Sequence, residues 1–553
     1  MTSPAPLPDS WFYALVIAGI LLNATGLVPP IMEPDGALYA SIAKTMAQTS
    51  DLVNLMAQGA DWLDKPHFPF WITALSYRVF GVNSFAYKFP ALLFWLAGIV
   101  YTHRFAQLVY PKLVAQVATL IVLTPYHLVL SNNDVRAEPY LTALVVGSVY
   151  HFYRVFLGGR GLHLILGALL MACAVMTKGP FVLVPVGAGL VGHWLIVGQG
   201  RELLRPRWYL ALALTVLFTT PELYCLYRQF DLHPEKIIFG QTGVSGVRFF
   251  FWDSQFGRFF NTGPIRGAGD PFFFLHTLLW AFLPWSLLLY SAVGKAIWGL
   301  IKRTDPLPEY VSLGSGLATL LLFSLSSFQL PHYLNLVFPF YAILSAHYLV
   351  SLRSEKALRT WTWIQTGIGV LMAILAVLLL VLFRPVGTGW AVAWLVTTGA
   401  VTLRLFHGTN LLTLLGRTIG ATVLLYGFLN LFLFPDMLQY QAGMKAADFL
   451  NDQPPGVVGV YGEGSYSFEF YLKQPLYFFS DSTLRQATAR QRSVRVFTSA
   501  KSADSLLRKG FSVKTLGTFP HFHVSQPSLE FINHQTRPAV LEPYVVAEVR
   551  HGD

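Results

Sequence analysis

One polar segment, DWLDKPHFPFW, sets charged side chains beside aromatic rings and prolines. Lys65 carries a point positive charge that suits a phosphate, and the rings around it suit a sugar or an isoprenoid tail. Asp64 and His67 belong to residue types that ligate metals, but two such side chains without further spacing do not define a metal site. The segment therefore predicts binding of an anionic ligand, with a divalent metal as the alternative use of Asp64 and His67.

A second acidic segment, MEPDGALYA, places Asp35 directly after an apolar run, with Glu33 two residues before it. Pro34 and Gly36 predict a tight turn, and the apolar spacing that follows predicts an amphipathic helix. Ionisable groups at the end of a membrane span are costly to bury, so Asp35 is a candidate functional residue. The alternative is that Asp35 only caps the helix.

Further charged side chains occur between other apolar runs. They are Asp134, Arg136 and Glu138 in NNDVRAEPY, Lys178 in MTKGP, and Arg248 and Arg258 in RFFFWDSQFGRFF. For each alone, a charge that flanks a span and reaches toward water is the competing interpretation. These residues gain weight as candidates if the chain brings them to one side of a membrane.

The elements that must position these residues are membrane helices. Of the 553 residues, 54% are hydrophobic and only 12% are charged, which excludes an ordinary soluble fold. Apolar stretches of roughly 20 residues, enough to cross a hydrocarbon core, recur along the chain. They predict about thirteen spans, near 11–30, 86–107, 112–130, 138–157, 161–177, 180–198, 207–228, 271–293, 308–328, 331–351, 361–383, 386–404 and 413–434.

Lys and Arg set the expected orientation, because short cytoplasmic loops collect them. Loops after even-numbered spans are rich in both, whereas short loops after odd-numbered spans carry little beyond Arg136, Lys178 and Arg384. The N-terminus is therefore expected inside and the C-terminus outside, with the first span kept as an uncleaved anchor. This orientation places all of the candidate residues on the outer face.

The chain is expected to form a transmembrane domain over 1–434 and a soluble periplasmic α/β domain over 435–553. Two outer loops, 31–85 and 229–270, are too long to be simple connectors. The first is expected to carry the amphipathic helix and a second helix through FPFWITALSYRVFG. Beyond the last span, VVGVYG, PLYFFS, VRVFTS, FSVKTLG and PYVVAEV predict strands, and KAADFLND and SADSLLRKG predict helices.

Charge and cysteine content argue against two classes of site. Much of the net charge of +11 sits in the cytoplasmic loops, so topology explains it and nucleic-acid binding is not expected. The only two cysteines, Cys173 and Cys225, both fall within predicted spans, which supports neither a disulfide framework nor a cysteine metal site.

Six segments occur along the chain in a fixed order: PDGALYASIAKTM, DKPHFPFW, FGVNSFAYKFPAL, MTKGP, PFFF…LPWSLLL and SSFQLPHYLNLVFP. Together they resemble the protein O-mannosyltransferase and aminoarabinose (lipid A) transferase group of integral-membrane glycosyltransferases. The resemblance covers most of the membrane part and implies the GT-C fold. The expected fold class is thus a polytopic α-helical membrane protein of about thirteen transmembrane helices with a small C-terminal α/β periplasmic domain.

The resemblance also implies roles for single residues. Asp35 matches the presumed catalytic base, and Lys65 and Arg258 match groups that contact the donor phosphate, a role in which Lys178 is also expected. Positioning of donor or acceptor is implied for Tyr39, Asp64, His67, Arg136, Glu138 and Tyr333, the last of which matches a position that lines the lipid-tail cavity.

Two positions depart from the family pattern. Gly36 follows Asp35 where the family commonly has a second acidic residue, so a second catalytic carboxylate is missing unless Glu33 replaces it. Leu38 precedes Tyr39 where aminoarabinose enzymes typically have Arg. The fold expectation is unaffected, but the sugar and the acceptor are left undefined.

The expected function is transfer of a sugar from a polyprenyl-phosphate donor to a lipid (lipid A-like) or protein acceptor. The reaction is expected at the periplasmic face of the bacterial inner membrane, with membrane lipids as surroundings, no nucleotide, and a divalent metal as an open question. A multi-span transporter or lipid flippase is the main alternative, and an envelope assembly scaffold is another. Against the transporter, no repeated halves are evident and the candidate residues gather on one face.

Overall fold

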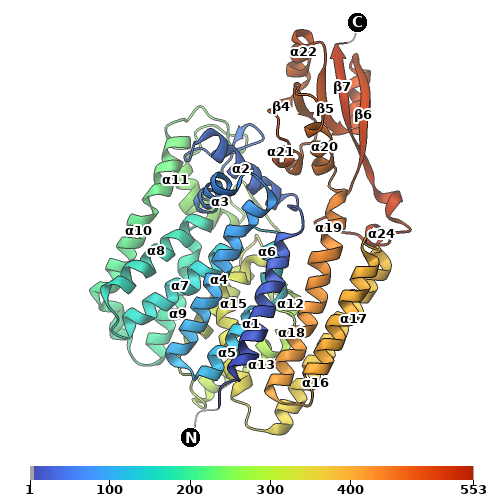
Figure 1. The fold of residues 1–553 in the computed structure, drawn as a ribbon. Coiled ribbons are helices and arrows are strands. Elements are labelled where there is room, and N and C mark those ends of the chain that lie inside the picture. The colour runs from blue at the N-terminus through green and yellow to red at the C-terminus, as the bar shows by residue number, and fades with distance from the viewer. Residues whose placement is uncertain (1–4, 552–553) are drawn as a thin grey trace.

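Long apolar helices make up most of the chain, and the computed structural model describes residues 5–551 of it (Figure 1). A helix satisfies its own backbone hydrogen bonds, which is why apolar runs of this length take that form in lipid. Every predicted span overlaps at least one helix. The helices of the predicted spans are α1 (Asp9–Ala24), α4 (Ser84–Val109), α5 (Lys112–Val122), α6 (Tyr126–Asn133), α7 (Glu138–Phe156), α8 (Gly161–Lys178), α9 (Leu183–Ile196), α10 (Pro206–Leu226), α12 (Phe273–Ala281), α13 (Ser286–Lys302), α14 (Val311–Ser324), α15 (Phe338–Val350), α16 (Glu355–Phe383), α17 (Thr388–Leu405) and α18 (Leu411–Phe428).

Fewer of these helices are long enough to cross a membrane unaided than the sequence predicts. Within residues 5–551, seven helical segments have the length and apolar composition of a span, or up to eight if the bent pair α5–α6 counts as one. The segments 180–196 and 311–324 are apolar but shorter. The fold is therefore a mostly helical membrane protein, and the count of thirteen spans stays a prediction.

Two of the predicted spans are each divided into two helices, because proline interrupts them. The predicted span 112–130 is two helices, α5 and α6, bent by 52°. Pro125 precedes α6, and Pro284 lies between α12 and α13 in the predicted span 271–293. Proline has no backbone N–H and clashes with the preceding turn of a helix, so each run divides at or near its proline.

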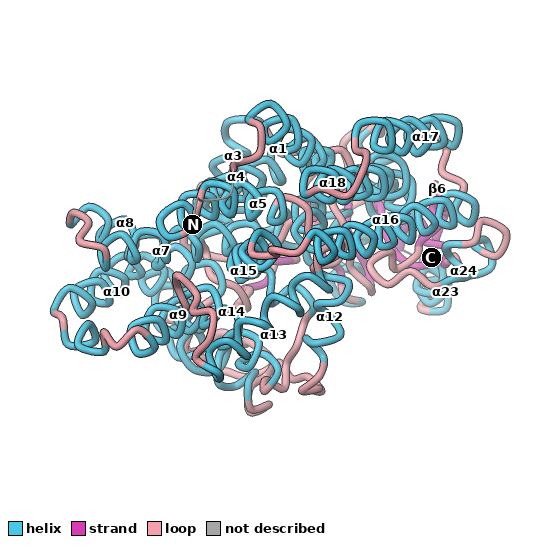
Figure 2. Tube along the Cα trace, turned by 90° about the horizontal axis from the view of Figure 1, so that it is seen from below, coloured by secondary structure: helices cyan, strands magenta, loops and turns pink. Residues whose placement is uncertain are grey.

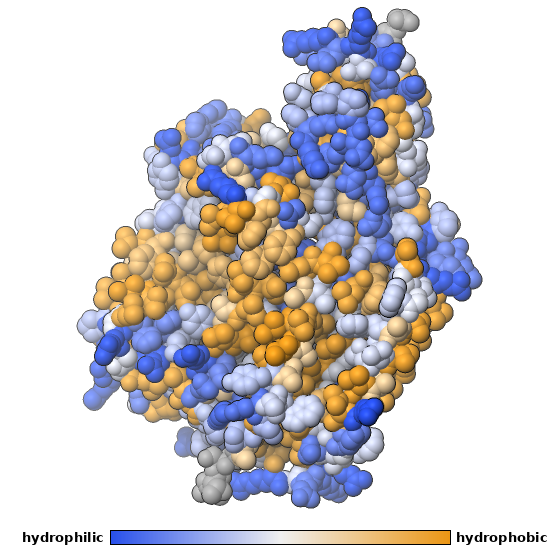
Figure 3. Space-filling view, viewed as in Figure 1, coloured by the Kyte–Doolittle hydropathy of each residue, from blue (hydrophilic) through white to orange (hydrophobic). Residues whose placement is uncertain are grey.

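The helices differ in how much of their surface is covered by protein. The side chains of α5, α7 and α15 are buried along nearly their whole length, whereas most side chains of α16 and α17 are exposed or only partly buried. Figure 2 places α8 and α10 at one side of the helical part and α16 and α17 at the other. Figure 3 shows hydrophobic residues over the middle of the helical part and hydrophilic residues at both of its ends and on the C-terminal unit. This distribution is typical of a protein with a lipid-facing belt.

The two long loops carry helices of their own at one end of the helical part. The first loop contains α2 (Asp35–Thr49), a two-residue hairpin of β1 (Met56–Ala57) and β2 (Ala60–Asp61), and α3 (Phe68–Phe80). The helices predicted at the start of this loop and through FPFWITALSYRVFG are thus confirmed. The second loop contains α11 (Gly246–Arg248) and a π-helix over Phe249–Gly257.

A five-stranded mixed sheet forms the C-terminal unit, stacked on the same end of the helices (Figure 1). All five runs predicted as strands are strands: β3 (Val458–Tyr461), β4 (Leu476–Phe479), β5 (Val494–Ser499), β6 (Phe511–His521) and β7 (Glu542–His551). Their order is β4-β3-β5-β7-β6, with β3 parallel to β4 and β5 and with β7 antiparallel to β5 and β6. The helices of this region are α19 (Phe434–Met437), α20 (Ala442–Asn451), α21 (Tyr466–Tyr471), α22 (Asp481–Arg490), α23 (Ala500–Arg508) and α24 (Leu529–Ile532).

Candidate functional site

A polar cavity of about 140 Å³ lies where α2, the loop before α3, and the ends of α7 and α8 meet. The sequence-predicted candidates dominate its lining, although they come from distant parts of the chain. Its charged and aromatic lining residues are Asp35, Tyr39, Asp64, Lys65, Arg136, Glu138, Lys178, Arg258, Phe328, His332 and Tyr333. Four basic side chains thus face three carboxyl side chains in one small space.

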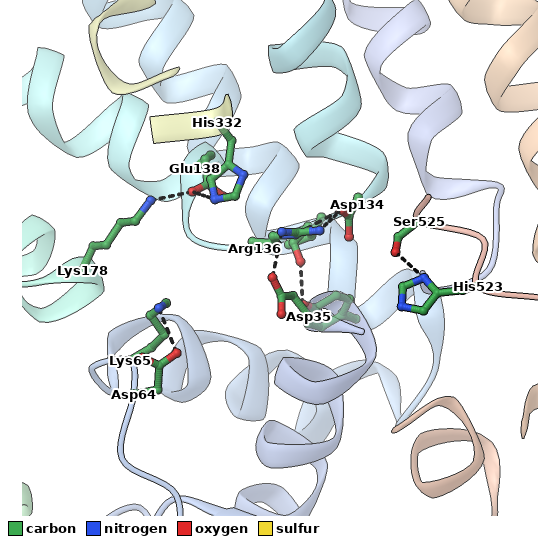
Figure 4. Close-up of polar contacts among 12 residues, drawn as sticks. Asp35, Asp64, Lys65, Asp134, Arg136, Glu138, Lys178, His332, His523 and Ser525 are labelled. Atoms are coloured by element: carbon green, nitrogen blue, oxygen red, sulfur yellow. Dashed lines mark hydrogen bonds and ion pairs between the residues drawn. The ribbon is translucent and has the colours of Figure 1, made fainter. Parts of the chain in front are cut away.

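Asp35 is held in this cavity by Arg136. It is the first residue of α2, where an acidic side chain suits the helix dipole, but within residues 5–551 its carboxylate hydrogen-bonds to Arg136 and not to the backbone of the helix. Arg136 donates from one terminal nitrogen to Asp35 Oδ2 at 2.7 Å and from the other to Asp134 Oδ2 at 2.7 Å (Figure 4). Burial raises the pKa of Asp35 above its ordinary value, and the charge of Arg136 opposes that rise. A carboxylate with a raised pKa is better matched to accepting a proton near neutral pH.

The structure explains why glycine occupies position 36, which the sequence alone does not show. A Cβ atom at this position would lie 3.0 Å from Asp134 Oδ1, so a side chain here would press on the Asp134 carboxylate that Arg136 holds. Arg136 also brings a second carboxylate, that of Asp134, close to Asp35.

Asp64 joins two of the cations on the opposite wall of the cavity. Lys65 Nζ lies 2.9 Å from Asp64 Oδ2, and Arg258, from the second long loop, donates to the other carboxylate oxygen. Burial alone would raise the pKa of Asp64, but the charges of Lys65 and Arg258 prevail and lower it to about 2. Asp64 is thus a permanent anion that holds two cations together without neutralising both.

A third ion pair closes the cavity from the helix ends. Glu138 is the first residue of α7, where a negative charge suits the helix dipole. It accepts a hydrogen bond from Lys178 Nζ at 2.8 Å, and His332 Nε2 lies 3.6 Å from the same oxygen (Figure 4). Lys178 Nζ also lies 4.2 Å from the centre of the Tyr333 ring. His332 is a cavity residue that the sequence reasoning passed over, although its position directly before Tyr333 was the available signal.

A larger and mainly apolar pocket of about 330 Å³ adjoins the polar cavity. The two spaces share Lys178, Arg258 and Tyr333 as lining residues. The remaining wall is rich in phenylalanine, at positions 181, 251, 256, 259, 260 and 323. Such a pair of spaces can hold a ligand with an anionic head and a long apolar tail.

Four of the predicted candidates, Glu33, His67, Asp134 and Arg248, lie outside the cavity lining. Glu33 faces the C-terminal unit, where its Oε1 atom accepts hydrogen bonds from Ser465 Oγ and from Ser467 N. Arg248 is mostly exposed and pairs only loosely with Asp253, at 3.7 Å, so Arg258 is the arginine of the second loop that reaches the cavity.

His67 is fully buried, and both of its ring nitrogens have partners within the protein. Its Nδ1 atom lies 3.0 Å from Glu222 Oε1, and its Nε2 atom lies 2.9 Å from the Val53 carbonyl oxygen. Glu222 stands 155 residues further along the chain, so no local pattern could have revealed this partner. The two ligands considered for a metal, Asp64 and His67, therefore have separate partners. Among residues 5–551, no group of three or more His, Cys, Asp or Glu side chains is arranged to hold a metal ion.

The chain is similar to known membrane glycosyltransferases in sequence. Residues 64–224 match the family model for dolichyl-phosphate-mannose-protein mannosyltransferase. The undecaprenyl phosphate-alpha-4-amino-4-deoxy-L-arabinose arabinosyl transferase of Pseudomonas paraeruginosa is 30% identical over 388 residues, which cover 68% of this chain and 67% of that protein. The protein of the same name from Edwardsiella ictaluri is 28% identical over 370 residues. That match and one to an uncharacterized protein of Aquifex aeolicus each span 61% of the relative's length.

The fold is also found among solved structures. ArnT from Cupriavidus metallidurans, bound to undecaprenyl phosphate, superimposes with a TM-score of 0.75 over 98% of both chains, at 18% identity. Its apo structure gives a TM-score of 0.73 over the same share. The fold is therefore GT-C, and the sequence matches show that the chain belongs to the undecaprenyl phosphate-alpha-4-amino-4-deoxy-L-arabinose arabinosyl transferase family.

Proposed function

We propose that this protein is a membrane glycosyltransferase that moves a sugar from a polyprenyl-phosphate donor to an acceptor at the outer face of the inner membrane. One observation carries the proposal: a cavity that holds Asp35 and four basic side chains opens next to an apolar pocket through shared side chains. A lipid phosphate fits this pair of spaces, with its head among the cations and its tail along the phenylalanines. The names of the relatives point to the same donor class, and they do not favour a transporter or flippase.

The proposed chemistry is displacement at the anomeric carbon of the sugar. The acceptor hydroxyl oxygen forms a bond to that carbon, its proton passes to the Asp35 carboxylate, and the bond from carbon to the phosphate oxygen breaks. The electron pair of that bond stays on the lipid phosphate, which gains negative charge. Lys65, Arg258 and Lys178 stabilise this charge, because they are cations placed in advance in a partly buried site.

The carboxylates that pair with these cations keep them in place before the ligand arrives. Asp64 holds Lys65 and Arg258, and Glu138 holds Lys178. Tyr39 and Tyr333 line the same cavity, where their rings suit a sugar face. An acceptor that offers a phosphate instead of a hydroxyl would need Asp35 less and positioning by the cations more.

The proposed function requires a defined membrane topology, and two classes of acceptor are compatible with it. The chain is proposed to cross the membrane thirteen times, with a cytoplasmic N-terminus and with the α/β unit of 435–553 in the periplasm, so that the cavity opens on the outer face. The acceptor is a lipid of the lipid A type or a protein.

The test is turnover by the purified protein in detergent with an undecaprenyl-phosphate sugar as donor. Lipid A and a periplasmic protein extract serve as separate acceptors, and mass spectrometry detects the glycosylated product. Transfer by the wild type, and none by a correctly folded Asp35→Asn protein, is the expected result. Wild-type protein that transfers nothing to either acceptor, yet moves solute or lipid across vesicles without a sugar donor, would overturn the proposal.

A further inference from the structure

A buried lysine that does not line the cavity holds the chain just before Asp35. Lys88 lies on α4 with none of its surface exposed. Its Nζ atom donates to the carbonyl oxygens of Gly26, Pro29 and Pro30, at 3.0, 2.7 and 3.3 Å. These carbonyls follow the first span, where a helix leaves backbone acceptors without partners. A buried ammonium is costly unless its hydrogen bonds are satisfied, so Lys88 and this turn stabilise each other.

The same ammonium reaches the segment on the other side of the Asp35–Arg136 ion pair. Lys88 Nζ lies 3.2 Å from Asn133 Oδ1. Asn133 is the last residue of α6 and directly precedes Asp134, which binds Arg136. Lys88 therefore ties together the two segments that supply Asp35 and Arg136.

The C-terminal unit holds the middle of the same turn from the opposite direction. Gln441 is fully buried, and its amide donates to the Ile31 carbonyl oxygen at 3.0 Å and accepts from Glu33 N at 2.6 Å. Tyr471, on α21, accepts a hydrogen bond from Ile31 N at 2.9 Å. The turn thus has partners on both sides, one in the membrane part and one in the α/β unit.

Glu33 completes this second anchor. Its carboxylate accepts from Ser465 Oγ at 2.8 Å and from Ser467 N at 2.6 Å, both at the start of α21. The side chain therefore points to the α/β unit, although only one residue separates Glu33 from Asp35. Its contacts are those of a link between two parts of the protein.

We propose that Lys88, Gln441 and Glu33 are positioning residues that fix the turn 26–34, and that the C-terminal α/β unit is for this reason part of the active-site structure. The catalytic part of this inference rests on the proposed function. A displacement of about 1 Å at a reacting group can reduce turnover about 100-fold. Loss of either anchor should therefore lower kcat while leaving the phosphate-binding side of the cavity intact.

The first test is independent of activity. Hydrogen–deuterium exchange of the peptide covering residues 26–35 is measured in the full-length wild type, Lys88→Met and Gln441→Leu proteins. Gln474→Leu is the matched control, because Gln474 also bridges two backbone groups, Leu450 O and Gly456 N, but within the α/β unit. Faster exchange in Lys88→Met and Gln441→Leu, with wild-type exchange in the control, is expected. Unchanged exchange in both anchor variants would overturn the inference whatever the activity of the protein.

The second test separates positioning from catalysis. Glu33→Gln keeps an oxygen that accepts from Ser465 and Ser467, whereas Glu33→Ala does not. A positioning role predicts that Glu33→Ala lowers kcat about 10- to 100-fold, with an unchanged Kd for undecaprenyl phosphate, and that Glu33→Gln restores most of kcat. Equal inactivation by both substitutions would identify Glu33 as a reacting carboxylate and would refute its positioning role. A wild type that transfers no sugar defeats the proposed function but leaves the exchange test decisive for the anchors.

Discussion

Lys65 offers the sharpest test of the phosphate site. Its Nζ atom lies 2.9 Å from Asp64 Oδ2, and it shares the cavity with Arg258 and Lys178. A hydrogen bond to a charged group contributes about 1.5–3 kcal/mol. Because each step of roughly 1.4 kcal/mol is tenfold in affinity, Lys65→Met should weaken binding of undecaprenyl phosphate about 10- to 150-fold. Arg136, Lys178 and Arg258 remain in the cavity, so binding is weakened and not abolished.

The assay is a titration of the purified protein in detergent, followed by microscale thermophoresis. Undecaprenol, which has the same tail without the phosphate, is the second ligand and should bind wild type and Lys65→Met equally. Lys236→Met is the control variant, because Lys236 also pairs with an aspartate of the first loop, Asp61 at 2.8 Å, but does not line the polar cavity.

Two results would refute this reasoning. Unchanged affinity of Lys65→Met for undecaprenyl phosphate would show that Lys65 does not contact the head group. An equal loss of affinity for undecaprenol would show that the substitution disturbs the apolar pocket and not a charge interaction.

Three further predictions concern single side chains. Asp35→Asn should lower kcat about 100- to 10,000-fold, the usual contribution of a general base, with an unchanged Kd for undecaprenyl phosphate; near-normal turnover of the folded variant would exclude this role. Arg136→Met removes the charge that opposes the raised pKa of Asp35, so the acidic limb of the kcat–pH profile should move to higher pH, and a shift to lower pH would contradict the assignment. Burial raises the pKa of Glu469, at the contact between α21 and α2, from 4.5 to about 7. The folded protein therefore binds more protons there than the unfolded chain between these values, and wild-type stability falls as pH rises through them. Glu469→Gln should be more stabilising at pH 8 than at pH 5, by up to about 3 kcal/mol from the size of the shift; equal melting-temperature changes at both pH values would refute the burial argument.

The helical architecture was predictable because its signal is local. A run of apolar residues predicts a helix wherever it lies in the chain, and the alternation in the α/β unit predicts its strands in the same way. The breaks between α5 and α6 and between α12 and α13 also had a local signal, since Pro125 and Pro284 stand inside the predicted spans. The apolar pattern alone did not predict that these prolines would divide each span into two helices.

The candidate site was predictable in its members but not in its pairings. Most of the predicted candidates line one cavity, and each was recognisable as a charge beside a span or as part of a motif. They include Asp35, Lys65, Arg136, Glu138, Lys178, Arg258 and Tyr333. Their partners are set by tertiary contacts across long separations, such as Arg136 with Asp35, 101 residues apart. Glu33 contacts α21 across more than 430 residues of chain, so from the sequence its role could only be inferred from its proximity to Asp35.

The wall of side chains shared by the polar cavity and the apolar pocket has a kinetic consequence. Lys178, Arg258 and Tyr333 border both spaces. In the proposed reaction, a carrier lipid therefore occupies the same place before and after it has given up its sugar. Under the proposed reaction, spent carrier competes directly with loaded carrier, and each cycle ends when the lipid diffuses sideways into the bilayer. The rate in a living membrane then follows the ratio of loaded to spent carrier, so the enzymes that recycle the carrier share control of the flux.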